Sequence, residues 1–196
     1  MTENFDLLTI GHSNLPPDRF AALLQGARVT AIVDVRSVAF SRRFPWFSQQ
    51  RLAERLARDG ISYLPMGDAL GGRPRDAALY RDGVADYEAM AVAPAFRAGL
   101  DRVTAEARRH RVCLMCAERE PLDCHRCLLV GRALAARGLA IGHVLVDGTV
   151  EPHTTTEQRL LALAGTAPAD LLDDAAARLD HAYRRRAKAV AARAKP

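Results

Sequence analysis

Residues 7–35 read LLTIGHSNLPPDRFAALLQGARVTAIVDV, and this stretch decides the fold. The apolar runs 7–10 and 31–35 are short and end at a glycine or in charged residues, which predicts two buried strands. Residues 17–26 lie between them, begin with a proline and carry apolar side chains at helical spacing, so they predict a helix. The stretch is therefore a strand–helix–strand unit.

The same alternation continues along the chain. Further strands are predicted at 61–64, 111–117 and 141–146, and further helices after Ser48 and at 84–92, 95–109 and 124–138. Residues 66–83 are rich in glycine, proline and charge, and they predict a long loop. Apolar strands that alternate with helices predict an α/β fold, with a mainly parallel sheet of about five strands and helices on both faces.

The pattern becomes purely helical after Pro152, and a second C-terminal helix is expected to open at Pro168. We therefore expect an α/β domain over residues 1–150 and a helical extension with a basic tail over 151–196. The tail, residues 181–196, holds six basic and no acidic residues, whereas the rest of this chain of net charge +5 is nearly neutral. Such a tail is usually a solvated helix end; the alternative is a segment that binds nucleic acid.

The composition restricts the class of protein. Of 196 residues, 49% are hydrophobic and 26% charged, which excludes disordered and fibrous proteins. The N-terminus has no basic targeting segment, and no stretch approaches the roughly 18–20 apolar residues of a membrane span. We therefore expect a cytoplasmic protein without a membrane partner. There the four cysteines stay reduced, so their even number does not predict disulfides.

Polar, titratable and small residues follow the predicted strands. In a parallel sheet these positions gather at one edge, where open α/β sheets bind ligands. A structural role is the alternative for several of them, because Asp34 and Arg36 can form an architectural ion pair and the two glycines match no complete phosphate-loop motif. The candidate ligand-binding residues at this edge are His12, Ser13, Asp34, Arg36, Ser41, Arg42, Gly71 and Gly72.

Residues 115–126, MCAEREPLDCHR, are the densest in chemistry. Cys116 ends a predicted strand, and Cys124 is expected in the first turn of the next helix, with Asp123 as its N-cap. Free amides and the helix dipole at that place stabilise a thiolate. The segment offers a nucleophile, proton-transfer groups and an anion clamp. The candidate catalytic residues are Cys116, Glu118, Cys124 and His125, and Arg126 is a candidate ligand-binding residue.

Three roles are open to the cysteines. All four have the spacing C-x2-C-x7-C-x2-C, but Cys113 and Cys116 face opposite sides of a strand and the spacer is short for a zinc ribbon. Cys113 and Cys127 are therefore expected to be small core residues. We favour a reactive or redox thiol at Cys116 or Cys124; a metal site of these two with a histidine, and purely structural thiols, remain the alternatives.

Several motifs in register resemble one known family. They are Thr9–Ser13 (TIGHS), 34–37 (DVRS) with Ser41, Arg42 and Phe47, 70–72 (LGG), 115–118 (MCAE) with Pro121, and 124–126 (CHR). In this order, from about residue 7 to 147, the chain resembles the bacterial domain-of-unknown-function family 488. The resemblance implies an α/β fold and marks the candidate residues above as site positions, but it brings no settled reaction. Ala39 stands where that pattern has a proline, and Cys113 and Cys127 are not part of the pattern.

These observations predict an enzyme that acts on an anionic or nucleotide-like small molecule. Arg36, Arg42 and Arg126 would hold the anionic group, and a cysteine would act as nucleophile or redox thiol in a transferase, hydrolase or redox enzyme. Glu118 and His125 would transfer protons. The sequence requires no cofactor. The alternatives are a nucleic-acid-binding protein that uses residues 181–196 and a metabolite sensor without turnover.

Overall fold

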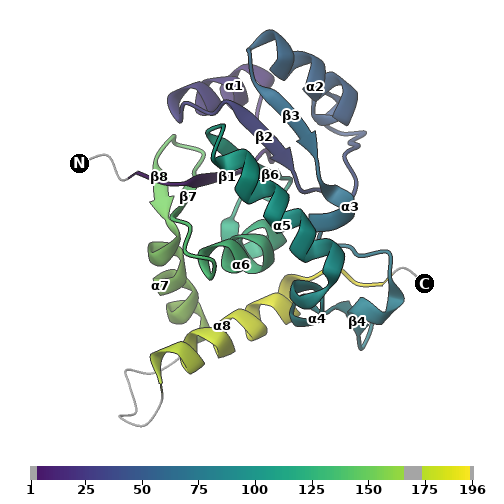
Figure 1. Cartoon of the computed structure of the whole chain (residues 1–196), viewed down its shortest axis with the longest axis vertical. Helices are drawn as coiled ribbons and strands as arrows, with labels where there is room; N and C mark the ends of the chain where they lie inside the picture. Colours follow the sequence, from purple (N-terminus) through teal and green to yellow (C-terminus); the bar gives the residue numbers. More distant parts are fainter. Residues whose placement is uncertain (1–3, 166–173, 195–196) are drawn as a thin grey trace.

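The computed structural model describes residues 4–165 and 174–194 and has a central sheet covered by helices (Figure 1). The strand order is β3-β2-β6-β1-β7-β8. The first five of these strands are parallel, and β8 pairs antiparallel with β7. The α/β fold is confirmed, and β8 is a further strand that the sequence pattern did not indicate. The strands are β1 (Leu7–Gly11), β2 (Ala31–Asp34), β3 (Ser62–Pro65), β6 (Val112–Cys116), β7 (Ile141–Val144) and β8 (Val150–Pro152).

The two faces of the sheet bury separate cores, because successive strand residues point to opposite sides. Leu8 and Cys113 lie in the core under α1 (Pro17–Gly26) and α2 (Gln49–Arg58). Leu7 and Cys116 lie in the larger core on the other face. The helices that join this larger core are α3 (Gly67–Leu70), α4 (Tyr87–Val92), α5 (Pro94–Ala107), α6 (Arg132–Ala135), α7 (His153–Ala164) and α8 (Ala175–Val190).

Residues 66–83 are more ordered than the predicted loop. They contain the short helix α3 (Gly67–Leu70), a 3-10 turn at Ala77–Leu79 and the first strand of a hairpin, β4 (Tyr80–Arg81), which pairs with β5 (Val84–Ala85). The helix forms because Met66 and Leu70 bury their side chains in the larger core. The predicted long loop therefore contains short elements that the sequence pattern did not indicate, since two apolar anchors are too few for a visible periodicity.

The predicted helix 124–138 begins differently from expectation. A 3-10 turn, Pro121–Asp123, comes first, and a π-helix, Arg126–Gly131, precedes α6. Cys124 has an extended backbone, its carbonyl accepts the first helical hydrogen bonds, and its Sγ accepts from the Arg126 amide (3.4 Å). Cys124 itself therefore caps the helix. The expectation of Asp123 as N-cap and Cys124 in the first turn was wrong, because the proline turn moves the helix start forward.

The C-terminal part packs on the same core as the sheet. Leu160 of α7 and Tyr183 of α8 are buried there. Beyond α8, which crosses one end of the molecule in Figure 1, the chain runs beside the small hairpin. There Ala85 N donates to Ala192 O (2.9 Å) and Ala194 N donates to Gly83 O (2.7 Å). The helix start expected at Pro168 lies outside the described residues, and the division at residue 150 stays a prediction.

Among the helices of the described residues, none has the length and apolar character needed to cross a membrane.

Candidate functional site

Two adjoining pockets open at the edge of the sheet where the parallel strands end. The cluster pocket, about 440 Å³, is lined among others by Gly72, Arg73, Cys116, Glu118 and His125. The histidine pocket, about 480 Å³, is lined among others by His12, Ser13, Ser41, Arg43 and Arg119. The two pockets share Arg36, Val38, Phe40 and Ala117. The strand ends thus meet at pockets, as expected for an open α/β sheet.

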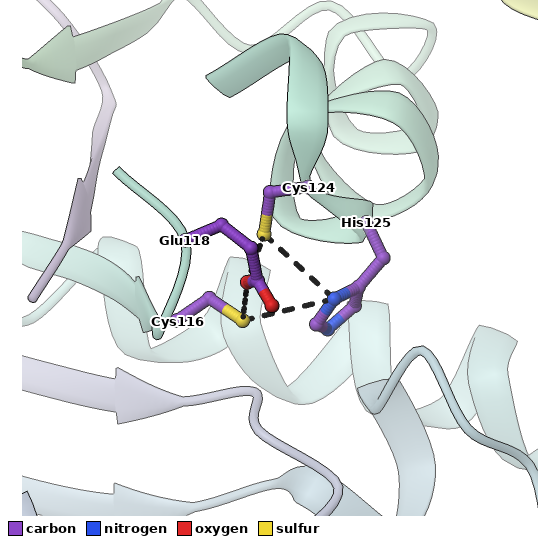
Figure 2. A group of neighbouring side chains, drawn as sticks. All are labelled: Cys116, Glu118, Cys124 and His125. Carbon is purple, nitrogen blue, oxygen red and sulfur yellow. Dashed lines mark hydrogen bonds between the residues drawn. The ribbon is translucent and has the colours of Figure 1, made fainter. Parts of the chain in front are cut away.

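Four reactive side chains converge beside the cluster pocket, and all but Cys124 line it (Figure 2). Cys116 ends β6, Cys124 and His125 begin the following helical segment, and Glu118 comes from the loop between them. One oxygen of Glu118, Oε2, lies within hydrogen-bond distance of the Sγ atoms of Cys116 (2.9 Å) and Cys124 (3.0 Å). Nδ1 of His125 lies 3.7 and 3.8 Å from the same two sulfurs. We call Cys116, Glu118, Cys124 and His125 the cysteine cluster.

The His125 ring is fixed from both sides. Its Nε2 donates to the carbonyl of Val35 (2.9 Å), which leaves Nδ1 as the nitrogen that faces the sulfurs. Gly72 packs against the ring so closely that a Cβ added there would lie 2.7 Å from Cγ of His125. This close approach explains a glycine at position 72. The loop after α3 therefore holds the imidazole in place.

The charges of the cysteine cluster are coupled. Burial, followed by Cys124 and Glu118, raises the pKa of Cys116 well above its usual value. Burial acts in the same direction on Cys124, but the hydrogen bond from Cys116 and the positive charges of Arg126 and His125 outweigh it and bring its pKa well below the usual value. The pKa of Cys124 is therefore the lower of the two thiol pKa values.

Glu118 is the solvent-exposed member of the cluster, although its carboxyl is turned toward the sulfurs. The resulting loss of hydration, together with the charge of Cys124, raises the pKa of its carboxyl. A raised carboxyl pKa favours a proton donor and acceptor near neutral pH.

Arg126 is buried behind the cluster and lines neither pocket. Its guanidinium donates to the carbonyls of Glu118 (2.6 Å) and Arg119 (2.9 Å). Within residues 4–165 and 174–194 it forms no ion pair, and its Nε has no hydrogen-bond partner. The cation therefore faces the thiol pair without a carboxylate of its own.

A second polar network borders the histidine pocket. Arg36 and Asp34 form a buried ion pair, and Tyr63 Oη donates to Asp34 Oδ2 (2.6 Å). Arg36 Nη1 donates to Nε2 of His12 (3.1 Å), whose Nδ1 donates to Ser13 O (2.9 Å). Burial, and then the Arg36 charge, lower the pKa of His12 to about 4. His12 is therefore a neutral acceptor at physiological pH.

The remaining predicted site residues differ in placement. Ser13 and Ser41 line the histidine pocket, whereas Arg42 is exposed and Arg43 takes the lining position beside it. Gly71 lines neither pocket and packs against α3, because a Cβ there would lie 2.3 Å from Gly67 O.

The cluster pocket also has lining residues that the sequence did not indicate. Tyr87, Val190 and Ala192 line the cluster pocket, and no local motif marks them.

A buried hydrogen-bond chain links the sheet to the C-terminal helices. Thr9 Oγ1 bonds to His143 Nδ1 (2.8 Å), His143 Nε2 to His153 Nδ1 (2.9 Å), and His153 Nε2 to Tyr183 Oη (3.1 Å). Tyr183 Oη donates to Glu157 Oε1 (2.9 Å). Burial lowers the pKa of both histidines. The chain contributes no residue to either pocket, and its partners are satisfied internally, so we assign it to stability.

Among the described residues of the basic tail, three arginine side chains contact the rest of the chain. Arg184 pairs with Glu88, Arg185 donates to Ala164 O (2.7 Å), and Arg186 pairs with Asp123. These contacts hold α8 against the body. Nucleic-acid binding by residues 181–196 stays a prediction.

Comparison with known proteins identifies one family. The family model described as domain of unknown function DUF488 matches residues 16–133. This span includes the whole cysteine cluster and begins just after His12. No curated protein and no solved structure matches the chain significantly.

Proposed function

The chain belongs to the DUF488 family, whose description names no reaction, and from the site we propose an enzyme that acts on an anionic small molecule. One observation carries the proposal: two thiols, a carboxyl and an imidazole lie within 4.8 Å of one another beside pockets lined by arginines. Such a concentration of coupled ionisable groups is typical of functional sites.

Unpaired arginines support an anionic substrate. Arg73 lines the cluster pocket, and Arg43 and Arg119 line the histidine pocket. In the part of the chain that the structure describes, none of the three forms an ion pair with a carboxylate. Their charges are therefore available for charge-assisted hydrogen bonds to a phosphate or carboxylate group. The exposed Phe40, shared by both pockets, offers a face for an aromatic base, which fits a nucleotide-like molecule.

The reaction we propose is a transfer or hydrolysis that depends on the thiols. Cys116 is the sulfur that borders the cluster pocket, and Glu118, exposed beside it, serves as proton donor and acceptor. The free cysteines fit a reducing compartment such as the cytoplasm.

Thermal-shift screening with inorganic phosphate, nucleotides and small carboxylates tests the anion site. We expect an anion to stabilise the protein, and Arg73→Ala to reduce this effect. Arg75→Ala is the matched control, because Arg75 is 89% exposed and pairs with Asp68 away from the pocket lining. Equal effects of both substitutions, or no stabilising anion, would refute the proposal.

Turnover separates an enzyme from a sensor. The stabilising anion is incubated with the protein and followed by mass spectrometry. Cys116→Ala is expected to abolish turnover, and Cys113→Ala, which removes a sulfur on the opposite face of the sheet, is expected to preserve it. A bound anion that is never converted would identify a sensor instead.

A further inference from the structure

Three buried atoms of the cysteine cluster already have the spacing of metal ligands. The Sγ atoms of Cys116 and Cys124 lie 3.7 and 3.8 Å from Nδ1 of His125. In a tetrahedral zinc site, with Zn–S near 2.3 Å and Zn–N near 2.0 Å, the sulfur–nitrogen distance is about 3.6 Å. The two sulfur–nitrogen distances therefore already fit a zinc site, and all four ligand atoms of the cluster lie within 4.8 Å of one another.

The fourth donor, Glu118, comes from the pocket side. Its Oε2 lies 2.9 and 3.0 Å from the two sulfurs, somewhat closer than the roughly 3.6 Å edge of a zinc tetrahedron. The side chain belongs to an exposed residue in the loop after β6, so it can retreat by the required fraction of an ångström. Three buried donors with one exposed donor form a set in which a substrate or water can enter the fourth position of a zinc ion.

The surroundings of His125 suit a metal ligand. A metal-bound histidine usually donates its second ring N–H to a carbonyl or carboxylate, which fixes the ring. Here Nε2 donates to Val35 O (2.9 Å), and Gly72 packs against the ring face. Nδ1 therefore points at the two sulfurs.

The charges balance when a divalent cation is present. Two thiolates and the Glu118 carboxylate carry three negative charges, and a divalent cation with the guanidinium of Arg126 carries three positive ones. Arg126 is buried, forms no ion pair within the described ranges 4–165 and 174–194, and its Nε lacks a hydrogen-bond partner there. An unpaired buried cation is costly, and a metal–thiolate group of charge −1 would compensate it.

We propose that Cys116, Cys124, His125 and Glu118 bind a zinc-class divalent cation. Two soft sulfurs and an imidazole select zinc over calcium or magnesium, which require oxygen ligands. The inference deepens the proposed function, because the ion would be the reactive centre of the same site. Activity would then depend on the two thiols because they hold the ion. Substrate would replace Glu118 as the fourth ligand at the pocket. Cys127, His143 and His153 also lie close together, but hydrogen bonds occupy their histidines.

Metal content of the full-length protein, purified with zinc in the medium and dialysed, tests the site. We expect about one zinc per chain in the wild type, and a loss of affinity of roughly 100-fold or more in Cys124→Ala. Cys113→Ala is the matched control, since it removes the same atom from the opposite core and should keep the zinc. Equal loss in both variants, or a wild type without zinc, would overturn the proposal.

Cobalt(II) binding to the wild type tests the same site and does not depend on whether Cys124→Ala folds. Cobalt(II) bound to the wild type should show a thiolate charge-transfer band and the intense visible bands of tetrahedral coordination. Glu118→Gln, at an exposed position, should keep the charge-transfer band and weaken binding by roughly tenfold. Absence of the band in the wild type would overturn the site. A zinc-bound protein that binds no anion would instead refute only the proposed function.

Discussion

Acid should destabilise this protein through His12, and His12→Gln isolates the effect. The pKa of His12 is lowered from 6.5 to about 4 in the folded protein, because the ring is buried and its Nε2 faces Arg36. Between pH 6.5 and about 4, His12 therefore stays neutral in the folded protein, whereas it binds a proton in the unfolded chain. The stability contributed by the neutral ring is present above pH 6.5 and is lost as the pH falls toward 4.

The magnitude follows from the two pKa values. Each pKa unit corresponds to about 1.36 kcal/mol, so lowering the pH from 7 to 5 should cost about 2 kcal/mol through His12 alone. Urea unfolding of wild type and His12→Gln at both pH values measures this. The free-energy difference between the two proteins should shrink by about 2 kcal/mol at pH 5, because the other titrating groups are common to both. A pH-independent difference would refute the burial and the Arg36 contact of His12.

Three further substitutions test the packing of the site, each by chemical denaturation. Asp34→Asn should lower the free energy of unfolding by about 3–5 kcal/mol, because it leaves the buried guanidinium of Arg36 unpaired. Asp68→Asn, in an exposed pair, is the control and should change stability little. A mild effect at position 34 would contradict the buried pair. Gly72→Ala should lower the free energy of unfolding by about 1–3 kcal/mol, because the new Cβ would lie 2.7 Å from the imidazole of His125. Gly26→Ala, with no atom within 4 Å of the new Cβ, is the control and should be neutral or stabilising. A larger loss of stability at position 26 than at position 72 would contradict this contact. Tyr183→Phe should cost about 1–2 kcal/mol by removing the hydroxyl that ends the buried histidine chain, and an unchanged midpoint would show that this chain adds no stability.

Many elements of the fold could be predicted because their signals are local. The helix at residues 17–26 has a proline at its start and buried side chains at helical spacing, and the structure has α1 at Pro17–Gly26. The strand periodicity of β6 also placed Cys113 and Cys116 on opposite faces, where the structure has them. Two-residue and 3.6-residue periods are properties of the sequence itself.

Features that depend on tertiary contacts could not be predicted in this way. The start of the helix at Cys124 depends on a proline turn, and the π-helix Arg126–Gly131 has no sequence period of its own. Arg126 carries the same charge as a surface arginine, and only the fold places it behind the cysteine cluster. The chain from Thr9 to Tyr183 joins residues that no short motif connects.

Val190 and Ala192 line the cluster pocket, and their position late in the chain affects the order of folding. Arg36 and Ala192 line the same pocket, although most of the chain separates them in sequence. Contacts between such distant segments carry a high loop-closure entropy and form late. We therefore expect the sheet to assemble before the pocket closes. Detachment of the segment after α8 would then be a partial unfolding that opens the site while the sheet stays intact.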